Sequence, residues 1–213
     1  TFLHGIAESF FTSHLGQVLE KDKSAEYARE LEELFDRALE ESDYTSYMKE
    51  HIRSAYREGV TGLAANILAE LDDVESAGCE VDIHSSLLNG RADAVLKKDD
   101  RIIIIDFKKS PPQSNARYQL LIYKRIMDEN AGMEVVDASD LYYYSFSLTT
   151  GRAHFFKECQ NEKKLEQLEA RLDEDLEKIG TGYAEGIWTP AADYDNCRDC
   201  SFRSVCRQRY FVK

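Results

Sequence analysis

The sequence predicts an α/β fold: a central mixed sheet flanked by helices, with a helical N-terminal portion and a cysteine-rich C-terminal tail. The sheet is indicated by two neighbouring stretches, the alternating residues Gly90 to Leu96 and the four consecutive isoleucines Ile102 to Ile105. An isoleucine run without a polar face is typical of a strand that is buried on both sides. We therefore expect the isoleucine strand to be central and the alternating strand to pair with it as a hairpin.

The hairpin register predicts a cluster of charges at one end of the buried strand. If the chain turns symmetrically about Asp99 and Asp100, Asp93 lies opposite Asp106, whereas a turn of odd length would shift this register. Like charges at directly opposed positions repel, and Lys108 points to the same face as Asp106 because side chains alternate along a strand. Two carboxylates that need a cation between them, beside an ammonium group, indicate a metal-dependent hydrolytic site.

The remaining elements are predicted from periodicity. Residues 1 to about 74 show apolar spacing typical of helices, and residues 80–87 alternate as a first strand should. Further along the chain we expect a helix over residues 115–130, strands over 141–148 and 152–157, and an amphipathic helix over 161–179. The tyrosines of residues 142–144 are interpreted as sheet packing more than as a platform for stacking bases.

Length and composition bound the class of protein. A chain of 213 residues buries one sizeable core, so we expect a single domain over residues 1–213, divided into a helical portion (1–76), an α/β core (79–180) and a cysteine-cluster tail (183–213). No apolar run is long enough to span a membrane. No signal peptide is visible, and a start at Thr1 fits a segment of a longer protein. Five cysteines, three of them clustered, fit a reducing compartment, and we expect a cytoplasmic protein.

The net charge of −13 is unevenly distributed. Residues 91–125 carry a net charge of +5 and residues 197–213 a net charge of +4, so the rest of the chain is strongly acidic. A basic strip around the predicted site would suit binding of a nucleic acid at one groove. The alternative is that these charges form ordinary solvated faces.

Three motifs together resemble the PD-(D/E)XK nucleases, specifically the RecB-like branch. They are Gly90-Arg91-Ala92-Asp93, Asp106-Phe107-Lys108 and a following helix that carries Gln119 and Tyr123. The segment Lys109-Ser110-Pro111-Pro112 departs from the family, which usually continues with Thr-Gly or Ser-Gly. The resemblance implies a restriction-endonuclease-like fold and hydrolysis of phosphodiester bonds.

The resemblance also assigns roles to residues. The segment around His4 looks like the N-terminal helix motif of RecB-like nucleases, although a lone histidine is more often a surface or core residue; His14 is a rival whose flanking sequence fits less well. Relatives would bind Mg²⁺ or Mn²⁺ through the residues corresponding to His4, Asp93, Asp106 and the Phe107 carbonyl, with Lys108, Gln119 and Tyr123 completing the catalytic set. Lys108 would orient water or stabilise the transition state, and Gln119 and Tyr123 would help to hold DNA and the active-site side chains.

The tail contains a Cys-x2-Cys-x5-Cys motif formed by Cys197, Cys200 and Cys206. Thiolates clustered this closely favour a soft metal or an iron–sulfur cluster. The motif resembles the C-terminal triplet of relatives with a 4Fe–4S cluster, including AddB-type helicase–nucleases and CRISPR-associated exonucleases. The fourth ligand would lie before Thr1 or be Cys79 or Cys159.

The combined prediction is a metal-dependent DNA nuclease, expected to act as an exonuclease on single strands or duplex ends. The resemblance implies DNA as substrate and a helicase domain or subunit as partner, in a repair or recombination machine. An alternative is a catalytically inactive module of such a complex that binds DNA or serves an iron–sulfur structural role. A hydrolase of small phosphoesters is chemically compatible, but nothing else in the sequence supports it.

Overall fold

The structure is a computed structural model that describes residues 2–85, 88–111, 117–129, 137–147, 154–157 and 161–186. The chain divides into two compact units, Thr1–Glu166 and Gln167–Lys213. Their boundary falls within helix α6 (Glu162–Glu185), the last described helix. The three-part organisation expected from the sequence stays a prediction.

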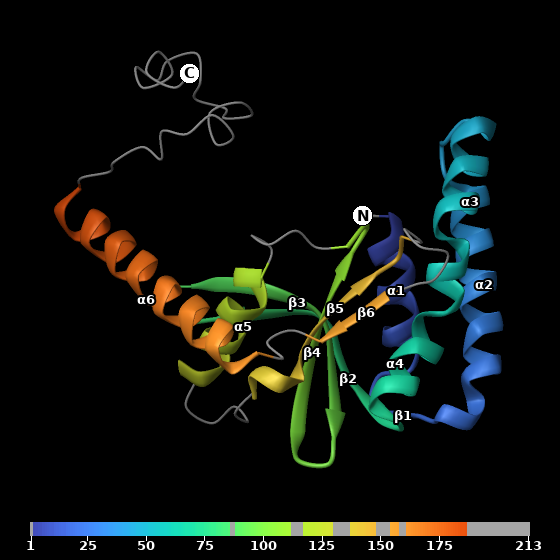
Figure 1. Cartoon of the computed structure of the whole chain (residues 1–213). Coiled ribbons are helices and arrows are strands. Elements are labelled where there is room, and N and C mark those ends of the chain that lie inside the picture. Colours follow the sequence, from blue (N-terminus) through green and yellow to red (C-terminus); the bar gives the residue numbers. More distant parts are fainter. Residues whose placement is uncertain are drawn as a thin grey trace. The chain divides into compact units, whose positions relative to one another are not determined.

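A six-stranded sheet forms the centre of the first unit (Figure 1). Its strands follow one another in chain order, and each pair of neighbours is antiparallel except β4 and β5, which are parallel. The predicted mixed sheet is therefore confirmed. The strands are β1 (Val18–Leu19), β2 (Val74–His84), β3 (Asn89–Lys98), β4 (Arg101–Lys108), β5 (Leu141–Ser145) and β6 (His154–Lys157).

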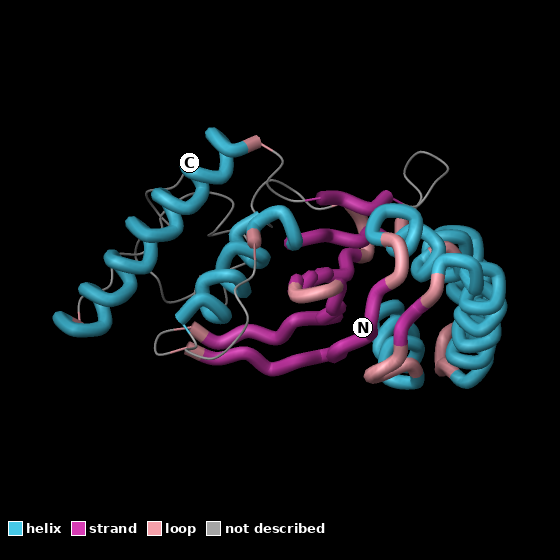
Figure 2. Tube along the Cα trace, turned by 90° about the horizontal axis from the view of Figure 1, so that it is seen from below, coloured by secondary structure: helices cyan, strands magenta, loops and turns pink. Residues whose placement is uncertain are grey.

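Helices cover both faces of this sheet, as Figure 2 shows. On one face α1 (Phe2–Ser13) and α4 (Leu63–Leu71) pack against strands, and α2 (Ser24–Glu41) and α3 (Ser46–Thr61) pack on these helices. On the other face α5 (Arg117–Glu129) contacts β2 and β3. Short 3₁₀ turns at Lys21–Lys23 and Ala138–Asp140 complete the described elements of this unit.

Strand β4 is central, as its sequence predicts. It is hydrogen-bonded to β3 on one side and β5 on the other, and Ile103 to Ile105 are fully buried. Tyr143 and Tyr144 on β5 are also buried, which confirms their interpretation as sheet packing. A strand enclosed on both faces leaves little water for any charge at its end, and this decides the electrostatics of the site described below.

The main core lies between β4 and the N-terminal helices. Helix α2 contributes Leu31, Phe35 and Leu39 at four-residue spacing, and each of these side chains is fully buried. Phe11 of α1 stacks on Phe107 of β4, with ring centroids 5.9 Å apart. Since Phe107 adjoins Asp106, this contact fixes α1 beside the charged end of the strand.

Helix α3 approaches the sheet closely at Gly59. A Cβ atom built at this position would lie 2.0 Å from the carbonyl oxygen of Phe146, so only glycine fits there. The approach lets the hydroxyl of Tyr144 donate a 2.6 Å hydrogen bond to the Gly59 carbonyl. This buried contact holds α3 against the end of β5.

Three details differ from the sequence prediction. The helical N-terminal portion contains a two-residue strand, β1, which is too short to show alternation but pairs with the start of β2. The predicted helical spacing continues through residue 62, but the structure has a break at Gly62 that separates α3 from α4. Strand β2 begins at Val74, ahead of the predicted start at residue 80. Within the residues that the structure describes, no helix has the length and hydrophobicity required for a membrane span.

Candidate active site

The hairpin of β3 and β4 brings the two predicted aspartates to the same end of the sheet. Its paired residues run from Lys98–Arg101 to Ala94–Ile105, which is the register predicted from a turn at Asp99 and Asp100. The next positions in this register are Asp93 and Asp106. The hairpin therefore places two carboxylates on neighbouring strands, in a part of the sheet that is covered on both faces.

Asp106 is a buried carboxylate in an unfavourable environment. Its side chain is 1 % exposed, and burial raises its pKa to about 6, with a further contribution from the charge of Asp93. Its Oδ2 atom accepts no well-directed hydrogen bond, although the ammonium nitrogen of Lys108 lies 2.5 Å away. The nearby cation offsets only part of the cost of burial.

Asp93 is held by the backbone of β4 and by helix α1. One of its oxygens, Oδ2, accepts a 2.6 Å hydrogen bond from the backbone N–H of Phe107. The same oxygen lies 3.4 Å from Nε2 of His4, and this contact raises the pKa of His4 despite partial burial of the ring. The Phe107 backbone raises it further. Asp93 is therefore in contact with both His4 and the backbone of Phe107.

A chain of hydrogen bonds connects Lys108 to helix α5. Nζ of Lys108 donates a 2.7 Å hydrogen bond to Oε1 of Gln119, and Nε2 of Gln119 donates a 2.6 Å hydrogen bond to the hydroxyl of Tyr123. Gln119 and Tyr123 lie one turn apart on α5, as the sequence predicts. Tyr123 is buried, and its pKa is raised to about 12 by that burial, with smaller contributions from Asp106 and Asp93.

Gly90 makes room for this arrangement. A Cβ atom at residue 90 would lie 2.8 Å from the ring of Tyr123, closer than side chains tolerate. The glycine of the Gly90-Arg91-Ala92-Asp93 motif thus lets α5 approach β3, while its aspartate supplies a charge to the site. The two ends of the motif serve different purposes.

The residue types fit a hard divalent cation. An imidazole, two carboxylates and a backbone carbonyl are ligands suited to Mg²⁺ or Mn²⁺. The buried Oδ2 of Asp106, which lacks a well-directed donor, is an atom that a cation would satisfy. In the described part of the chain, no group of three or more His, Cys, Asp or Glu side chains is already gathered around one point. Lys108 and the Phe107 N–H instead occupy oxygens of the two aspartates.

Two contributions to the site were not predicted from the sequence. The Phe107 N–H donates a hydrogen bond to Asp93. Every residue except proline has a backbone N–H, so this donor cannot be recognised from the sequence. Glu80 of β2 is only 26 % exposed and raises the pKa of Tyr123. It also has a positive φ of 50°, an uncommon backbone conformation for glutamate that distinguishes it from its strand neighbours.

The rival histidine lies elsewhere. His14 is 3.4 Å from Glu30 of α2 and within 3.0 Å of the Phe10 carbonyl, at the far end of α1 from His4. This position favours a structural role. His4 is the histidine that the fold places at the carboxylates.

Four of the nine basic residues of the predicted strip form ion pairs with acids outside residues 91–125. The ion pairs are Arg91 with Asp82, Lys98 with Asp72, Arg101 with Asp140 and Lys124 with Asp128. Because these acids lie outside residues 91–125, the positive field is weaker than the net charge of that segment alone predicts. Lys109 is different, because it is exposed and its Nζ lies 5.8 Å from the ring centroid of Tyr56.

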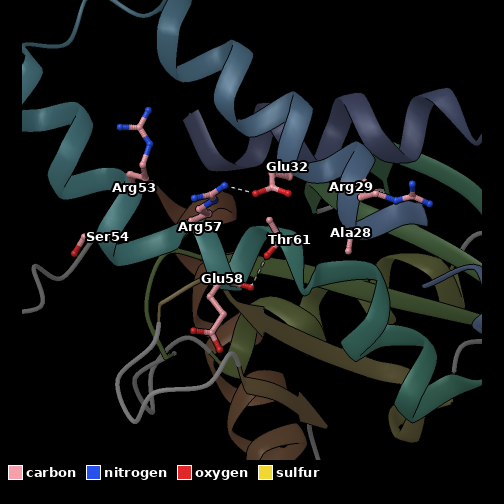
Figure 3. A pocket seen from close by; sticks show the side chains of 8 residues that line it. All are labelled: Ala28, Arg29, Glu32, Arg53, Ser54, Arg57, Glu58 and Thr61. Carbon is pink, nitrogen blue, oxygen red and sulfur yellow. Dashed lines mark hydrogen bonds and ion pairs between the residues drawn. The ribbon is translucent and has the colours of Figure 1, made fainter. Parts of the chain in front are cut away.

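A second concave region lies between α2 and α3, away from this site (Figure 3). Its arginines suggest an anion site, but two of the three, Arg53 and Arg57, are already paired. Arg57 forms an ion pair with Glu32, which Figure 3 shows as a dashed line. Arg53 lies 3.4 Å from Glu50 and 3.5 Å from Glu40. These ion pairs join the two helices and leave little net charge for a phosphate.

The cysteine predictions are only partly covered by the structure. Cys197, Cys200, Cys206 and Cys159 lie outside the described residues. Cys79 lies on β2, where its thiol donates to the Asp93 carbonyl and burial raises its pKa to about 12. To serve as a cluster ligand, Cys79 would have to lose this proton and this hydrogen bond.

Comparisons with known proteins place this chain in a family. No curated protein matches the chain. Among solved structures, a crystal structure of SSO0001 matches with 17% sequence identity and a TM-score of 0.34, over 96% of this chain and 95% of that one. A family model described as the PD-(D/E)XK nuclease superfamily matches residues 1–207, nearly the whole sequence. This chain belongs to the PD-(D/E)XK nuclease superfamily.

Proposed function

We propose that the protein is a Mg²⁺- or Mn²⁺-dependent deoxyribonuclease of the RecB-like branch, acting as an exonuclease on single strands or duplex ends. The observation that carries the proposal is the arrangement of Asp106 and Lys108. A buried carboxylate with a raised pKa lies 2.5 Å from a lysine that is itself held by Gln119. Such an arrangement is costly for stability and is typical of a functional site.

The residues divide into two groups by role. His4, Asp93, Asp106 and the Phe107 carbonyl would hold the cation, which when bound promotes deprotonation of water and offsets phosphate charge. Lys108 would orient the attacking water or stabilise negative charge that builds on the phosphoryl oxygens. Gln119 and Tyr123 fix the lysine in place through their hydrogen bonds. In the reaction, a water oxygen bonds to phosphorus, the bond to one ester oxygen breaks, and the released strand end gains a hydroxyl group.

A degradation assay tests this proposal. End-labelled and circular single strands are incubated with wild-type protein, with and without Mn²⁺ or Mg²⁺. We expect metal-dependent loss of the linear strand and survival of the circle; cleavage of the circle would instead indicate an endonuclease. If wild-type protein binds DNA but cleaves no strand with any divalent metal, the protein is a binding module and the proposal is wrong.

Two substitutions separate the roles in the site. Asp106→Ala removes a ligand, so metal affinity and cleavage should fall together. Lys108→Ala leaves both carboxylates, so metal should still bind while the rate drops by about 10²–10³. Lys124→Ala is a matched control, because Lys124 pairs with Asp128 on α5 and lies outside the hydrogen-bond chain. It should retain wild-type activity.

The cysteine motif extends the proposal. We expect Cys197, Cys200 and Cys206 to bind a 4Fe–4S cluster, with the fourth ligand supplied by Cys79, by Cys159 or by residues upstream of Thr1. Protein extended upstream and purified anaerobically should be brown and should melt at a lower temperature after chelation, because metal binding adds to folding stability. A colourless protein whose melting temperature does not respond to chelators would contradict this part alone. A helicase domain or subunit as partner is proposed from the same resemblance, and co-purification with a helicase would test it.

A further inference from the structure

A small pocket adjoins the proposed active site. It has a volume of about 270 Å³ and lies between α1, α3 and the segment that follows β4. His4 forms part of its wall, and so does Lys109, the residue after Lys108. The pocket therefore adjoins His4, one of the proposed metal ligands. None of the roles proposed above uses it.

The other walls of the pocket are mainly aromatic. Phe2 and Tyr44 meet edge to face with ring centroids 5.9 Å apart, and Tyr56 and Ile52 line the side formed by α3. These four side chains are only partly buried. Partly exposed aromatic side chains around a cavity are suited to stacking with a flat ring system. The volume lies just below the roughly 300 Å³ at which pockets for drug-sized ligands begin, and this suits one ring system better than a larger ligand.

A positive charge lies at the same pocket. Nζ of Lys109 is 5.8 Å from the ring centroid of Tyr56, and the side chain is exposed. Apolar and aromatic walls with an ammonium group at one side match a nucleotide, in which a flat base is joined to a phosphate. A purely apolar ligand would leave the ammonium group without a role.

We propose that this pocket binds the base of a nucleotide next to the scissile phosphate, and that the substrate is unpaired at this position. A paired base is stacked within the duplex and cannot enter a side pocket without leaving its partner. Stacking on Tyr56 would hold the base while Lys109 contacts a neighbouring phosphate. The proposal rests on the proposed nuclease function and specifies its substrate as a single strand, or the frayed end of a duplex.

The first test uses wild-type protein and a series of single-stranded substrates. Each substrate carries one abasic site, placed at successive positions around the cleaved bond. A base that occupies the pocket contributes to binding only at its own position. We expect KM to rise about 5- to 100-fold for an abasic site at one position, the range expected for loss of one stacked base, and to change little at the others.

The second test uses variants of the pocket. Tyr56→Ala should raise KM for the intact strand by a similar factor, with a smaller effect on kcat, and should make the variant insensitive to the critical abasic site. Tyr56→Phe keeps the ring and should behave as wild type. Tyr47→Ala is a matched control on the same helix, because Tyr47 is 83 % exposed and lies outside the pocket. Thermal melting of each variant separates loss of stacking from loss of folding.

The outcomes distinguish this inference from the function on which it rests. If wild-type protein cleaves no DNA, both are wrong. If it cleaves DNA but every abasic position is tolerated equally, or Tyr56→Ala matches Tyr47→Ala, the nuclease proposal stands and the base pocket does not. Loss of activity shared by Tyr56→Ala and Tyr56→Phe would also overturn the inference, since the ring alone should suffice.

Discussion

Oε1 of Gln119 lies 2.7 Å from Nζ of Lys108, so that a residue of helix α5 holds the lysine of strand β4. Lysine has a long side chain with many rotamers, and ordering it costs conformational entropy. The amide of Gln119 provides a fixed acceptor, and Tyr123 in turn orients that amide. The position of the amine is thus set by a helix that follows the strand in sequence.

Removing this acceptor should slow catalysis without removing a ligand. For Gln119→Ala we expect kcat to fall by roughly tenfold or more, because a group misplaced by a small distance loses much of its effect on the transition state. Metal affinity should stay near the wild-type value. Steady-state cleavage assays and a metal titration measure the two quantities. Asp128→Ala on the same helix loses only a partly exposed ion pair and should leave both unchanged.

His4 of α1 and His14, which directly follows this helix, should behave differently. His4→Ala should weaken Mn²⁺ binding by at least 10–100-fold, because it removes a group in contact with Asp93. His14→Ala should leave Mn²⁺ affinity unchanged, since His14 lies beside Glu30. Isothermal titration calorimetry measures the Mn²⁺ affinity of each variant. Equal affinities for the two variants would remove His4 from the ligand set.

The raised pKa of Asp106 makes the stability of the metal-free protein depend on pH. Above pH 3.8 the unfolded state loses its proton first, so the cost of burying the carboxylate grows until about pH 6 and is constant beyond it. The full rise in the pKa of Asp106 corresponds to a loss of about 3 kcal/mol in the free energy of unfolding. Lowering the pH from 7 to 5 should therefore stabilise the wild type by about 1 kcal/mol relative to Asp106→Asn. Urea unfolding of both proteins without metal measures this difference. Parallel pH profiles would show that Asp106 titrates normally.

Two glycines give a matched pair of stability predictions. Gly90→Ala would push a methyl group into the ring of Tyr123 and should destabilise the protein by about 1–3 kcal/mol. It should also reduce cleavage, since it displaces the partner of Gln119. Gly5 lies inside α1 with no atom within 4 Å of the position of an added Cβ, so Gly5→Ala should stabilise the protein by about 0.5–1 kcal/mol. Urea midpoints that shift in the same direction for both variants would contradict the packing assigned to Gly90.

The sequence predicted local relationships well because their physical causes are local. The register that aligns Asp93 with Asp106 follows from a short polar turn, and the burial of Ile103 to Ile105 follows from an uninterrupted apolar run. The pairing of Gln119 with Tyr123 follows from helical periodicity.

Relationships that depend on the folded arrangement were missed. The basic strip is one example, because the acids that neutralise Arg91 and Arg101 lie on other elements of the sheet region. The hydrogen bond from the Phe107 N–H to Asp93 is another, since backbone donors are the same at every residue except proline. The contact of His4 with Asp93 was reached only through resemblance to known nucleases, because no local pattern connects residues so far apart.

The stacking of Phe107 on Phe11 has a consequence for how the protein becomes active. Contacts between segments distant in the sequence form late in folding, because closing a long loop costs entropy before any contact repays it. His4 reaches Asp93 only when α1 has docked through this ring contact, and Lys108 is held only when α5 has formed. A partly folded chain would hold the lysine or the histidine out of place, so the proposed site is complete only when both helices have docked.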